Sequence, residues 1–166
     1  MVCRCGSCVQ CHLIRKAALR RKPQLANHKT TEAEKKIIVE WKYADEYSIY
    51  DCSLSFEEMK RKHCMFANAQ NHFTPSLNNG ILIGFMNLNK EDQRVFFGIG
   101  VHPDCCGNGY GSEMTAITCQ LCRELFRNKP LYLEVRDWNR RAIQCYLNAG
   151  FQIDGESFEQ KTHAVR

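Results

Sequence analysis

The stretch VFFGIGVHPDCCGNGYG, residues 95–111, decides the fold that we expect for this chain. Apolar, β-prone residues run from Val95 to Val101 and predict a strand. A G-x-G-x-G turn at residues 107–111 follows, and the residues after it have the pattern of a helix. Glycines let the backbone approach an anion, and a helix N-terminus adds N–H groups and a partial positive charge. The stretch therefore predicts a phosphate-binding turn, although glycines placed for packing alone would give the same pattern.

Two known phosphate motifs fit this turn poorly. The dinucleotide fingerprint is G-x-G-x-x-G after the first strand of its unit, whereas this turn is G-x-G-x-G in the middle of the chain. A P-loop ends in Gly-Lys-Ser/Thr, and no lysine stands between Gly111 and Ser112.

Length and composition limit the class of protein. The 166 residues suit one domain with a hydrophobic core, and 44% hydrophobic and 25% charged residues are ordinary for a globular protein. Apolar runs such as ILIGFMNL are strand-sized, and the N-terminus lacks the apolar core of a signal peptide. We therefore expect a cytoplasmic protein without a membrane segment.

The charge is unevenly distributed along the chain. The formal net charge is +5, but residues 1–30 carry seven basic residues and no acidic residue, so the remainder has a net charge of −2. Because the folded body is not basic, we do not expect it to bind nucleic acid, and any such binding would belong to the N-terminal extension.

The first 12 residues, MVCRCGSCVQCH, hold four of the eleven cysteines next to His12: Cys3, Cys5, Cys8 and Cys11. Their spacing resembles that of metal ligands, but a structural zinc site usually draws two ligand pairs from separate segments. Three alternatives stay open: a disordered thiol-rich leader, a metal site, and a targeting or added segment. We expect residues 1–12 to be a leader and residues 13–166 a single domain, assign no metal ligands, and interpret the later cysteines as reduced thiols.

Caps and periodicity place the elements before the glycine turn. Residues 12–18 could form a first strand. Thr31 begins a helix, and Ser55-x-x-Glu58 is a capping box that opens a second helix through about Phe66. Residues 72–101 read as three antiparallel strands, with a tight turn at Asn79-Gly80 and another at residues 89–93. The apolar face of the first helix is predicted to hold Ile37, Ile38 and Trp41.

The elements after the turn follow from the same rules. A helix from Tyr110 is predicted to carry an apolar stripe of Met114, Ile117, Leu121 and Leu125. Residues 131–135 suit a central parallel strand, and a last helix ends at Gly150, before a final strand starting at residues 151–153. The inward side of that helix is predicted to hold Ala142, Ile143, Tyr146 and Leu147. The order predicts an α/β fold: a mixed sheet, made of an antiparallel meander plus one parallel crossover, sandwiched by helices. A right-handed crossover places the glycine turn at the carboxyl end of its strand, where open sheets bind ligands.

Two segments of this sequence resemble the GCN5-related N-acetyltransferases, the acetyl-CoA-dependent GNAT superfamily. They are VHPDCCGNGYGSEM and LEVRDWNRRAIQCYLNAGF, in the family's order. The more specific part is Asn139-x-x-Ala142-x-x-x-Tyr146-x-x-x-Gly150-Phe151. The similarity is strongest from about Gly80 to Ile153 and weaker over residues 31–79.

The resemblance implies acetyl-CoA as the cofactor and gives several residues a role. The N–H groups that would bind the CoA pyrophosphate belong to Cys106, Gly107, Asn108, Gly109, Tyr110, Gly111 and Ser112. On the fourth strand the cofactor-binding residues would be Ile99, Gly100 and Val101, with backbone hydrogen bonds from Ile99 and Val101 to the pantetheine arm. Asn139 would fix that arm from the other side, and Tyr146 would lie near the CoA sulfur as general acid.

The sequence departs from the family pattern at three points. Cys106 stands where relatives often have Arg or Gln, which backbone binding of the phosphate would tolerate. No carboxylate lies on the fourth strand, so Glu134 on the fifth strand is the nearest candidate general base; a structural role for Glu134 is the alternative. Only 15 residues follow Phe151, so we expect the last strand of the family's closing hairpin to be very short or absent.

We therefore predict an N-acetyltransferase that moves an acetyl group from acetyl-CoA to a primary amine, expected to be a small molecule, by direct attack in a ternary complex. Residues 41–51 form an aromatic, acidic loop that would receive a cationic amine through Asp45, Glu46 and Asp51, or would be a solvated connection. A homodimer is left open. Two alternatives are a CoA-binding protein without catalysis and a module that binds metal or nucleic acid through its leader.

Overall fold

The fold was analysed in a computed structural model, which describes residues 23–26, 28–68, 73–127 and 129–154. The strand predicted at residues 12–18 and the leader at residues 1–12 lie outside these residues. Five strands form one sheet in sequential order: β1 (Gln24–Leu25), β2 (Phe73–Asn78), β3 (Ile81–Lys90), β4 (Val95–Val101) and β5 (Leu131–Tyr132). The pairs from β1 to β4 are antiparallel, and β4 and β5 are parallel. The predicted fold class is confirmed.

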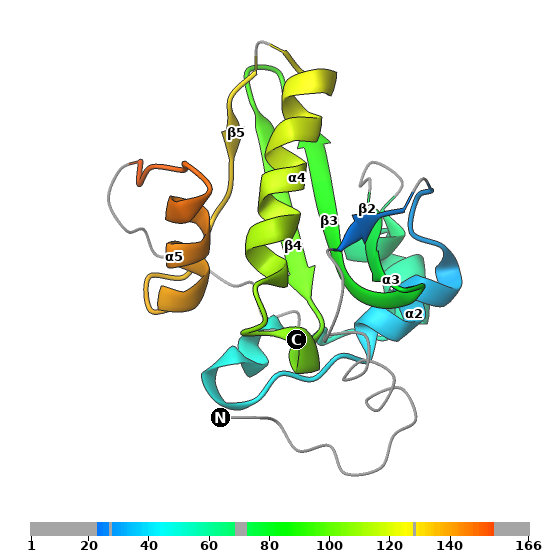
Figure 1. The fold of residues 1–166 in the computed structure, drawn as a ribbon. Helices are drawn as coiled ribbons and strands as arrows, with labels where there is room; N and C mark the ends of the chain where they lie inside the picture. Colours follow the sequence, from blue (N-terminus) through cyan, green and yellow to red (C-terminus); the bar gives the residue numbers. More distant parts are fainter. Residues whose placement is uncertain (1–22, 27, 69–72, 128, 155–166) are drawn as a thin grey trace.

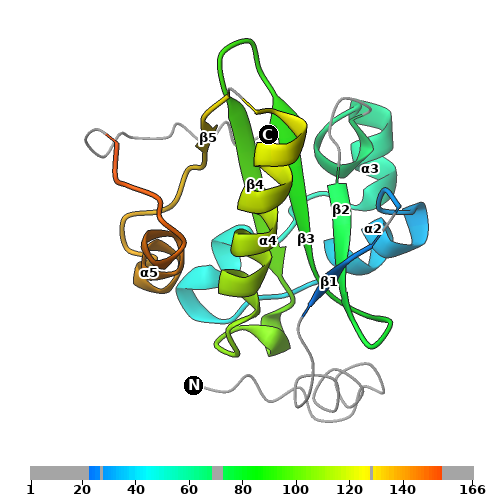
Figure 2. The same cartoon turned by 45° about the horizontal axis from the view of Figure 1, so that its top comes forward.

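Helices cover both faces of the sheet (Figures 1 and 2). Helix α4 (Tyr110–Leu125) runs across β3 and β4 on one face, and α5 (Arg140–Asn148) lies beside it next to β5. Helices α2 (Glu32–Val39) and α3 (Phe56–Lys62) pack on the other side, near β2. Three short 3₁₀ helices connect these elements: η1 (Asp45–Tyr50), η2 (Met65–Ala67) and η3 (Pro103–Cys105). The predicted crossover through α4 therefore brings the glycine turn to the end of β4.

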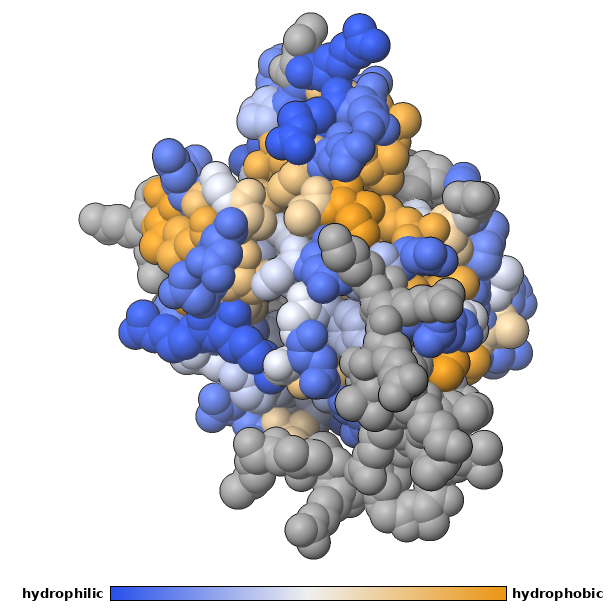
Figure 3. Space-filling model, viewed as in Figure 1, coloured by the Kyte–Doolittle hydropathy of each residue, from blue (hydrophilic) through white to orange (hydrophobic). Residues whose placement is uncertain are grey.

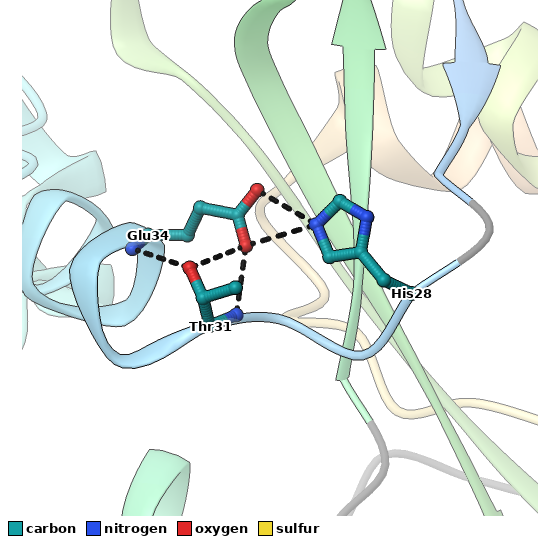
Figure 4. A network of polar contacts seen from close by, with 3 residues as sticks. All are labelled: His28, Thr31 and Glu34. Carbon is teal, nitrogen blue, oxygen red and sulfur yellow. Dashed lines mark hydrogen bonds and ion pairs between the residues drawn. The ribbon is translucent and has the colours of Figure 1, made fainter.

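The first two helices begin where the caps predict. Glu34 donates its N–H to the Thr31 hydroxyl at 3.2 Å, and its carboxylate accepts the Thr31 N–H at 2.7 Å. Figure 4 shows that His28 reaches the same carboxylate, with its Nε2 3.1 Å from Oε1. Ser55 and Glu58 form the same capping box at α3. Both sequence predictions are confirmed, and His28 adds a link between the segment after β1 and α2.

In the β2–β3 hairpin, a turn and a bulge determine which face of the sheet each side chain lies on. Asn79 and Gly80 have φ values of 51° and 77°, as the predicted tight turn requires. The pairing shifts at Ser76/Leu77, so Ile83 is an extra residue on β3 between Leu82 and Gly84. From Gly84 onward the alternation is regular, and each side chain of β3 can be assigned to a face from its partner on β4.

The buried faces of three helices differ in part from the prediction. Ile38 and Trp41 are buried, but Ile37 is 43% exposed. On α4 the buried residues are Tyr110, Met114, Thr115, Thr118 and Cys122, whereas Leu125 is 60% exposed; on α5 Leu147 is 40% exposed. Gly84 explains the rotation of α4, because a Cβ there would lie 2.8 Å from the Met114 Cε. The missing side chain lets α4 dock at Met114. Leu125 lies on the same side of the helix as Met114, since 11 residues make about three turns, and it is exposed as the last residue of α4.

Three predicted element ends are wrong. The second helix ends at Lys62 because His63 adopts the left-handed conformation, with φ 48°, and Phe66 is buried in η2 instead. The fifth strand spans only Leu131–Tyr132, since β4 and β5 part after that point. Residues 151–154 form no strand within the described chain, since Phe151 packs against Phe97 and Tyr146 instead of pairing.

Within the described residues, no helix is long and apolar enough to cross a bilayer. The seven described cysteines are free thiols. The same residues contain no group of three or more His, Cys, Asp or Glu side chains placed to hold a metal ion.

Candidate active site

The glycine turn connects β4 to α4, at the lower end of α4 in Figure 1. Gly107 and Gly109 have φ values of 81° and 83°, which strain any residue with a Cβ. A Cβ at either position would meet no atom within 4 Å. These two glycines are therefore not needed for close packing inside the protein, and the space in front of them is open. Gly111 differs, because its Cβ would touch the Cys145 sulfur at 3.7 Å.

The start of α4 presents backbone donors at the turn. Gly109 is the N-cap residue, and no side chain caps the helix there. The N–H of Glu113 makes the first bond of the helix, to the Gly109 carbonyl at 3.2 Å. The N–H groups of the first turn, including Gly111 and Ser112, are thus not satisfied within the helix. Asn108 braces the turn by donating its Nδ2 to the carbonyls of Cys105 and Cys106.

The carboxyl half of β4 has one edge without a strand partner in the described chain. β5 pairs with β4 only at Val95 and Phe96. The N–H of Val95 bonds to the Pro130 carbonyl, and the N–H of His102 bonds to the Ile83 carbonyl. Odd-numbered residues of β4 therefore direct their main-chain groups toward β5, and even-numbered residues direct theirs toward β3. It follows that the main-chain groups of Ile99 and Val101 face the gap between the strands, while those of Gly100 face β3.

Two tyrosines of the 41–51 loop reach this gap. The Tyr43 hydroxyl donates to the Val101 carbonyl at 2.9 Å, and the Asn139 Nδ2 donates to the Tyr50 hydroxyl at 3.0 Å. Burial raises the pKa of Tyr43 strongly, so the phenol keeps its proton. Trp138 packs against Tyr50, with ring centroids 6.0 Å apart. The loop therefore covers the place where β4, β5 and the start of α5 meet.

Asn139 combines two tasks. Its Oδ1 accepts the Ala142 N–H at 3.1 Å and so caps α5, while its Nδ2 holds Tyr50. The residue is only 7% exposed. Its place beside the gap agrees with the cofactor role that the resemblance implies, but its side chain already has partners on both ends.

Tyr146 lies in the apolar cluster between α4, α5 and the sheet. Its ring packs edge-on against Phe151, with centroids 6.0 Å apart. Burial raises the pKa of Tyr146, and the neighbouring Cys145 and Tyr50 raise it further. A phenol with a raised pKa stays protonated, so it can donate a hydrogen bond but gives up its proton with difficulty. Cys145 points toward α4, where the Ser112 hydroxyl donates to its sulfur at 3.3 Å.

The thiols beside the turn are poor nucleophiles. Burial raises the pKa of Cys105 to about 12 and also raises the pKa of Cys106, although Arg141 lowers the latter. A thiol is nucleophilic as its thiolate, so both groups are largely inert at neutral pH. The effect of Arg141 on Cys106 and Tyr43 places a positive charge near the turn. Its guanidinium also lies 4.6 Å from the centroid of the Tyr47 ring.

The predicted acidic residues are spread over two places. Glu134 is exposed, two residues beyond the end of β5, and its charge acts on Arg94 and Tyr132. Asp51 accepts the Tyr43 N–H at 2.8 Å and lies 3.7 Å from the Lys42 amine. Asp45 and Glu46 are exposed at the start of η1. The roles of these acids, and of the cofactor-binding residues, stay predictions.

Sequence reasoning missed Tyr43, Tyr50 and Arg141 as site residues. It read the tyrosines only as part of an aromatic loop. The one signal for Arg141 was its position two residues after Asn139 in the α5 motif, and the fold brings all three to the end of β4.

Comparison with known proteins identifies the family. The acetyltransferase (GNAT) family profile matches residues 35–151, which is more than half of the chain. The chain therefore belongs to the acetyltransferase (GNAT) family; it is an N-acetyltransferase whose cofactor is acetyl-CoA. No curated protein is similar enough in sequence to match the chain.

Several solved structures share the fold. A chimera of the spermidine N-acetyltransferase SpeG from Vibrio cholerae and hSSAT superposes with a TM-score of 0.68 at 18% identity, covering 84% of this chain and 89% of that one. The V. cholerae spermidine N-acetyltransferase in complex with CoA and spermine gives 0.66 at 19% identity, covering 81% and 83%. A transcriptional regulator from Bacillus halodurans C-125 gives 0.64 at 16% identity, covering 84% and 100%. At these identities the likeness concerns the fold.

The described residues fit CoA. Three features suit a pyrophosphate. The space in front of Gly107 and Gly109 is open, the first N–H groups of α4 have no partner within the helix, and the positive charge of Arg141 is nearby. Main-chain groups of Ile99 and Val101 face the gap between β4 and β5, where an amide-bearing arm can pair with them.

Proposed function

We propose that this protein transfers the acetyl group of acetyl-CoA directly to a primary amine, with both substrates bound at once. The observation that carries the proposal is that an open glycine turn and the gap between β4 and β5 both lie at the carboxyl end of β4. Acetyl-CoA supplies the acetyl group as an activated thioester. Gly107, Gly109 and the N–H groups of α4 hold the phosphates, and Ile99 and Val101 align the arm in the gap.

Positioning supplies most of the rate in this proposal. Holding an amine and a thioester in attack geometry replaces a bimolecular step by an effectively intramolecular one. The thiols of Cys105 and Cys106 stay protonated, which supports direct transfer over an acyl-enzyme. The amine nitrogen forms the new bond to the acetyl carbon as the bond from that carbon to sulfur breaks. Tyr146 keeps its proton and donates a hydrogen bond to the departing CoA thiolate, which takes a proton from solvent, and Glu134 takes the proton that the amine loses.

The two tyrosine contacts order the site. Tyr43 holds the Val101 carbonyl and Tyr50 holds Asn139, so the 41–51 loop closes over the arm-binding gap from the side of η1. The amine would approach from the sheet face opposite α4. Asp51 is already paired with Lys42 and Tyr43, so Asp45 and Glu46 are the loop acids that a cationic amine would meet.

Turnover with a panel of primary amines tests this proposal. Release of the free CoA thiol should depend on the amine, and initial rates should give intersecting lines when both substrates are varied. Intact-mass spectrometry after incubation with acetyl-CoA alone should show an unmodified chain. Acetylation of Cys106 or Cys145 that is transferred on to the amine would replace direct transfer by a two-step reaction.

A further inference from the structure

One buried amide oxygen on the face of the sheet opposite α4 has no hydrogen-bond partner among the described residues. Asn87 lies in the middle of β3 and is 7% exposed, and its Oδ1 is buried without a hydrogen bond. A buried amide oxygen without a partner costs free energy, so such groups are uncommon in folded proteins. A site that binds a ligand gives a reason for keeping it.

The sheet register places Asn87 beside the gap. Asn87 pairs with Gly98 of β4. The last residue of β4 that pairs with β5 is Phe96, opposite Tyr132, and Gly98 is the next residue along β4 on the same face. Gly98 carries no side chain; a Cβ there would have the Asn87 Cβ 3.6 Å away and no closer atom than a Phe96 ring carbon at 3.5 Å. Gly98 itself therefore places no side chain between Asn87 and the gap, and the β4 side chain nearest to this position is Phe96.

Glu134 belongs to the same face, on the far side of β4. The β4–β5 register pairs Phe96 with Tyr132, and the chain leaves β4 after that pair, so Glu134 follows two residues beyond the last paired position. Leu131 and Leu133 pack into the cluster under α4, which assigns Tyr132 and Glu134 to the opposite face. The electrostatic effect of Glu134 on Tyr132 agrees with that assignment. An amide on the β3 side of β4 and a carboxylate on the β5 side thus belong to one face of the sheet.

The geometry points to Asn87 as a binding residue for the primary amine. Its carboxamide oxygen accepts a hydrogen bond from the amine over Gly98, opposite Glu134, which takes the departing proton. The attacking nitrogen is then held where β4 and β5 part, next to the arm-binding groups of Ile99. This inference rests on the proposed amine acetylation, to which it adds the acceptor-binding residue.

The described neighbours of Asn87 explain why its Oδ1 has no partner among the described residues. Its partner on β2 is Phe73, which packs with Phe66 and Phe85 at centroid distances of 4.5 and 5.7 Å. These rings offer no strong acceptor or donor. Asn87 thus lies between an aromatic residue on β2 and a glycine on β4.

The test compares Asn87→Leu with Asn89→Leu. Asn89 lies two residues along the same strand on the same face, but opposite Phe96, where β4 and β5 are still paired. The probe is n-butylamine, titrated into ¹⁵N-labelled protein saturated with CoA. In the parent the side-chain amide signal that Asn87→Leu removes should shift saturably. Asn87→Leu should weaken n-butylamine binding about tenfold or more, as loss of one hydrogen bond to a charged group implies; Asn89→Leu should not.

Thermal unfolding separates binding from structure. Because the Oδ1 of Asn87 has no partner among the described residues, Asn87→Leu should raise Tm by about 2–4 °C. A lower Tm, an amide signal that n-butylamine does not move, or equal effects of both substitutions would overturn the inference. Calorimetry with acetyl-CoA reports on the cofactor site separately. Failure of the parent to bind acetyl-CoA would refute the proposed function. Normal acetyl-CoA binding, together with n-butylamine binding that Asn87→Leu does not change, would refute only this inference.

Discussion

Alanine in the glycine turn should weaken cofactor binding without unfolding the protein. Gly107 and Gly109 have φ near +80°, where a residue with a Cβ costs about 1–2 kcal/mol. For a chain of this size that strain lowers Tm by about 2–8 °C. The added methyl groups would stand in the open space where we place the phosphates. Losing one hydrogen bond from a backbone N–H to a charged oxygen costs about 1.5–3 kcal/mol, or about 10- to 150-fold in Kd.

Gly80→Ala provides a matched control. Gly80 also has a positive φ, 77°, and a Cβ there would also meet no atom within 4 Å, but it lies in the β2–β3 turn. We expect Gly80→Ala and Gly109→Ala to lower Tm alike, while only Gly109→Ala weakens acetyl-CoA binding in calorimetry. Equal acetyl-CoA affinity in the two variants would refute the assignment of the turn as the phosphate site.

Three further predictions concern single side chains. Tyr146→Phe should lower kcat about 10- to 30-fold, as expected for one lost hydrogen bond, and leave the Kd of acetyl-CoA unchanged in calorimetry; an unchanged kcat would remove Tyr146 from the reaction. Burial lowers the pKa of His102 although Asp104 opposes the shift, so its contribution to stability is present above about pH 6.5 and is lost as the pH falls through the lower folded pKa. Tm should therefore fall more steeply from pH 7 to pH 5 in the parent than in His102→Asn, and parallel curves would contradict this. Cys105 has its pKa raised from 9.0 to about 12, which cuts its thiolate about 1,000-fold at pH 8. Iodoacetamide should then leave Cys105 unlabelled in the native chain, as peptide mass spectrometry can show, and labelling as fast as in urea would oppose it.

Local signals were sufficient for much of the fold. The capping boxes at Thr31 and Ser55 depend on residues three positions apart, and the Asn79-Gly80 turn depends on two adjacent residues. The strand, glycine turn and helix of residues 95–125 were also readable, because one continuous segment carries the whole unit. Each of these features is set by neighbours in the sequence.

The element ends and helix faces that were predicted wrongly depend on contacts between distant segments. The length of β5 depends on where β4 leaves it, which periodicity in residues 131–135 does not encode. The orientation of α4 depends on Gly84 of β3, which admits Met114, and the exposure of Leu125 depends on its place at the end of α4. Helical spacing fixes which residues share a stripe but leaves open which side of that stripe meets the sheet.

In the candidate site, too, residues in local motifs could be assigned from the sequence, whereas contacts between distant residues could not. The glycines and Asn139 stand in motifs, so the resemblance could assign them. Tyr43 meets Val101 across 58 residues, and Tyr50 meets Asn139 across 89. The pairing of Asn87 with Gly98, and the end of the β4–β5 pairing just before Gly98, require the register of three strands. Contacts of this kind require the fold.

Transfer of a labelled acetyl group tests the central claim most directly. The purified chain would be mixed with acetyl-CoA carrying ¹³C in the acetyl group and with a panel of primary amines, and the products analysed by mass spectrometry. We expect labelled acetyl-amine to form in an amount equal to the free CoA thiol. Bound acetyl-CoA that releases no thiol with any amine above the enzyme-free rate, or releases thiol without labelled amine, would contradict the account.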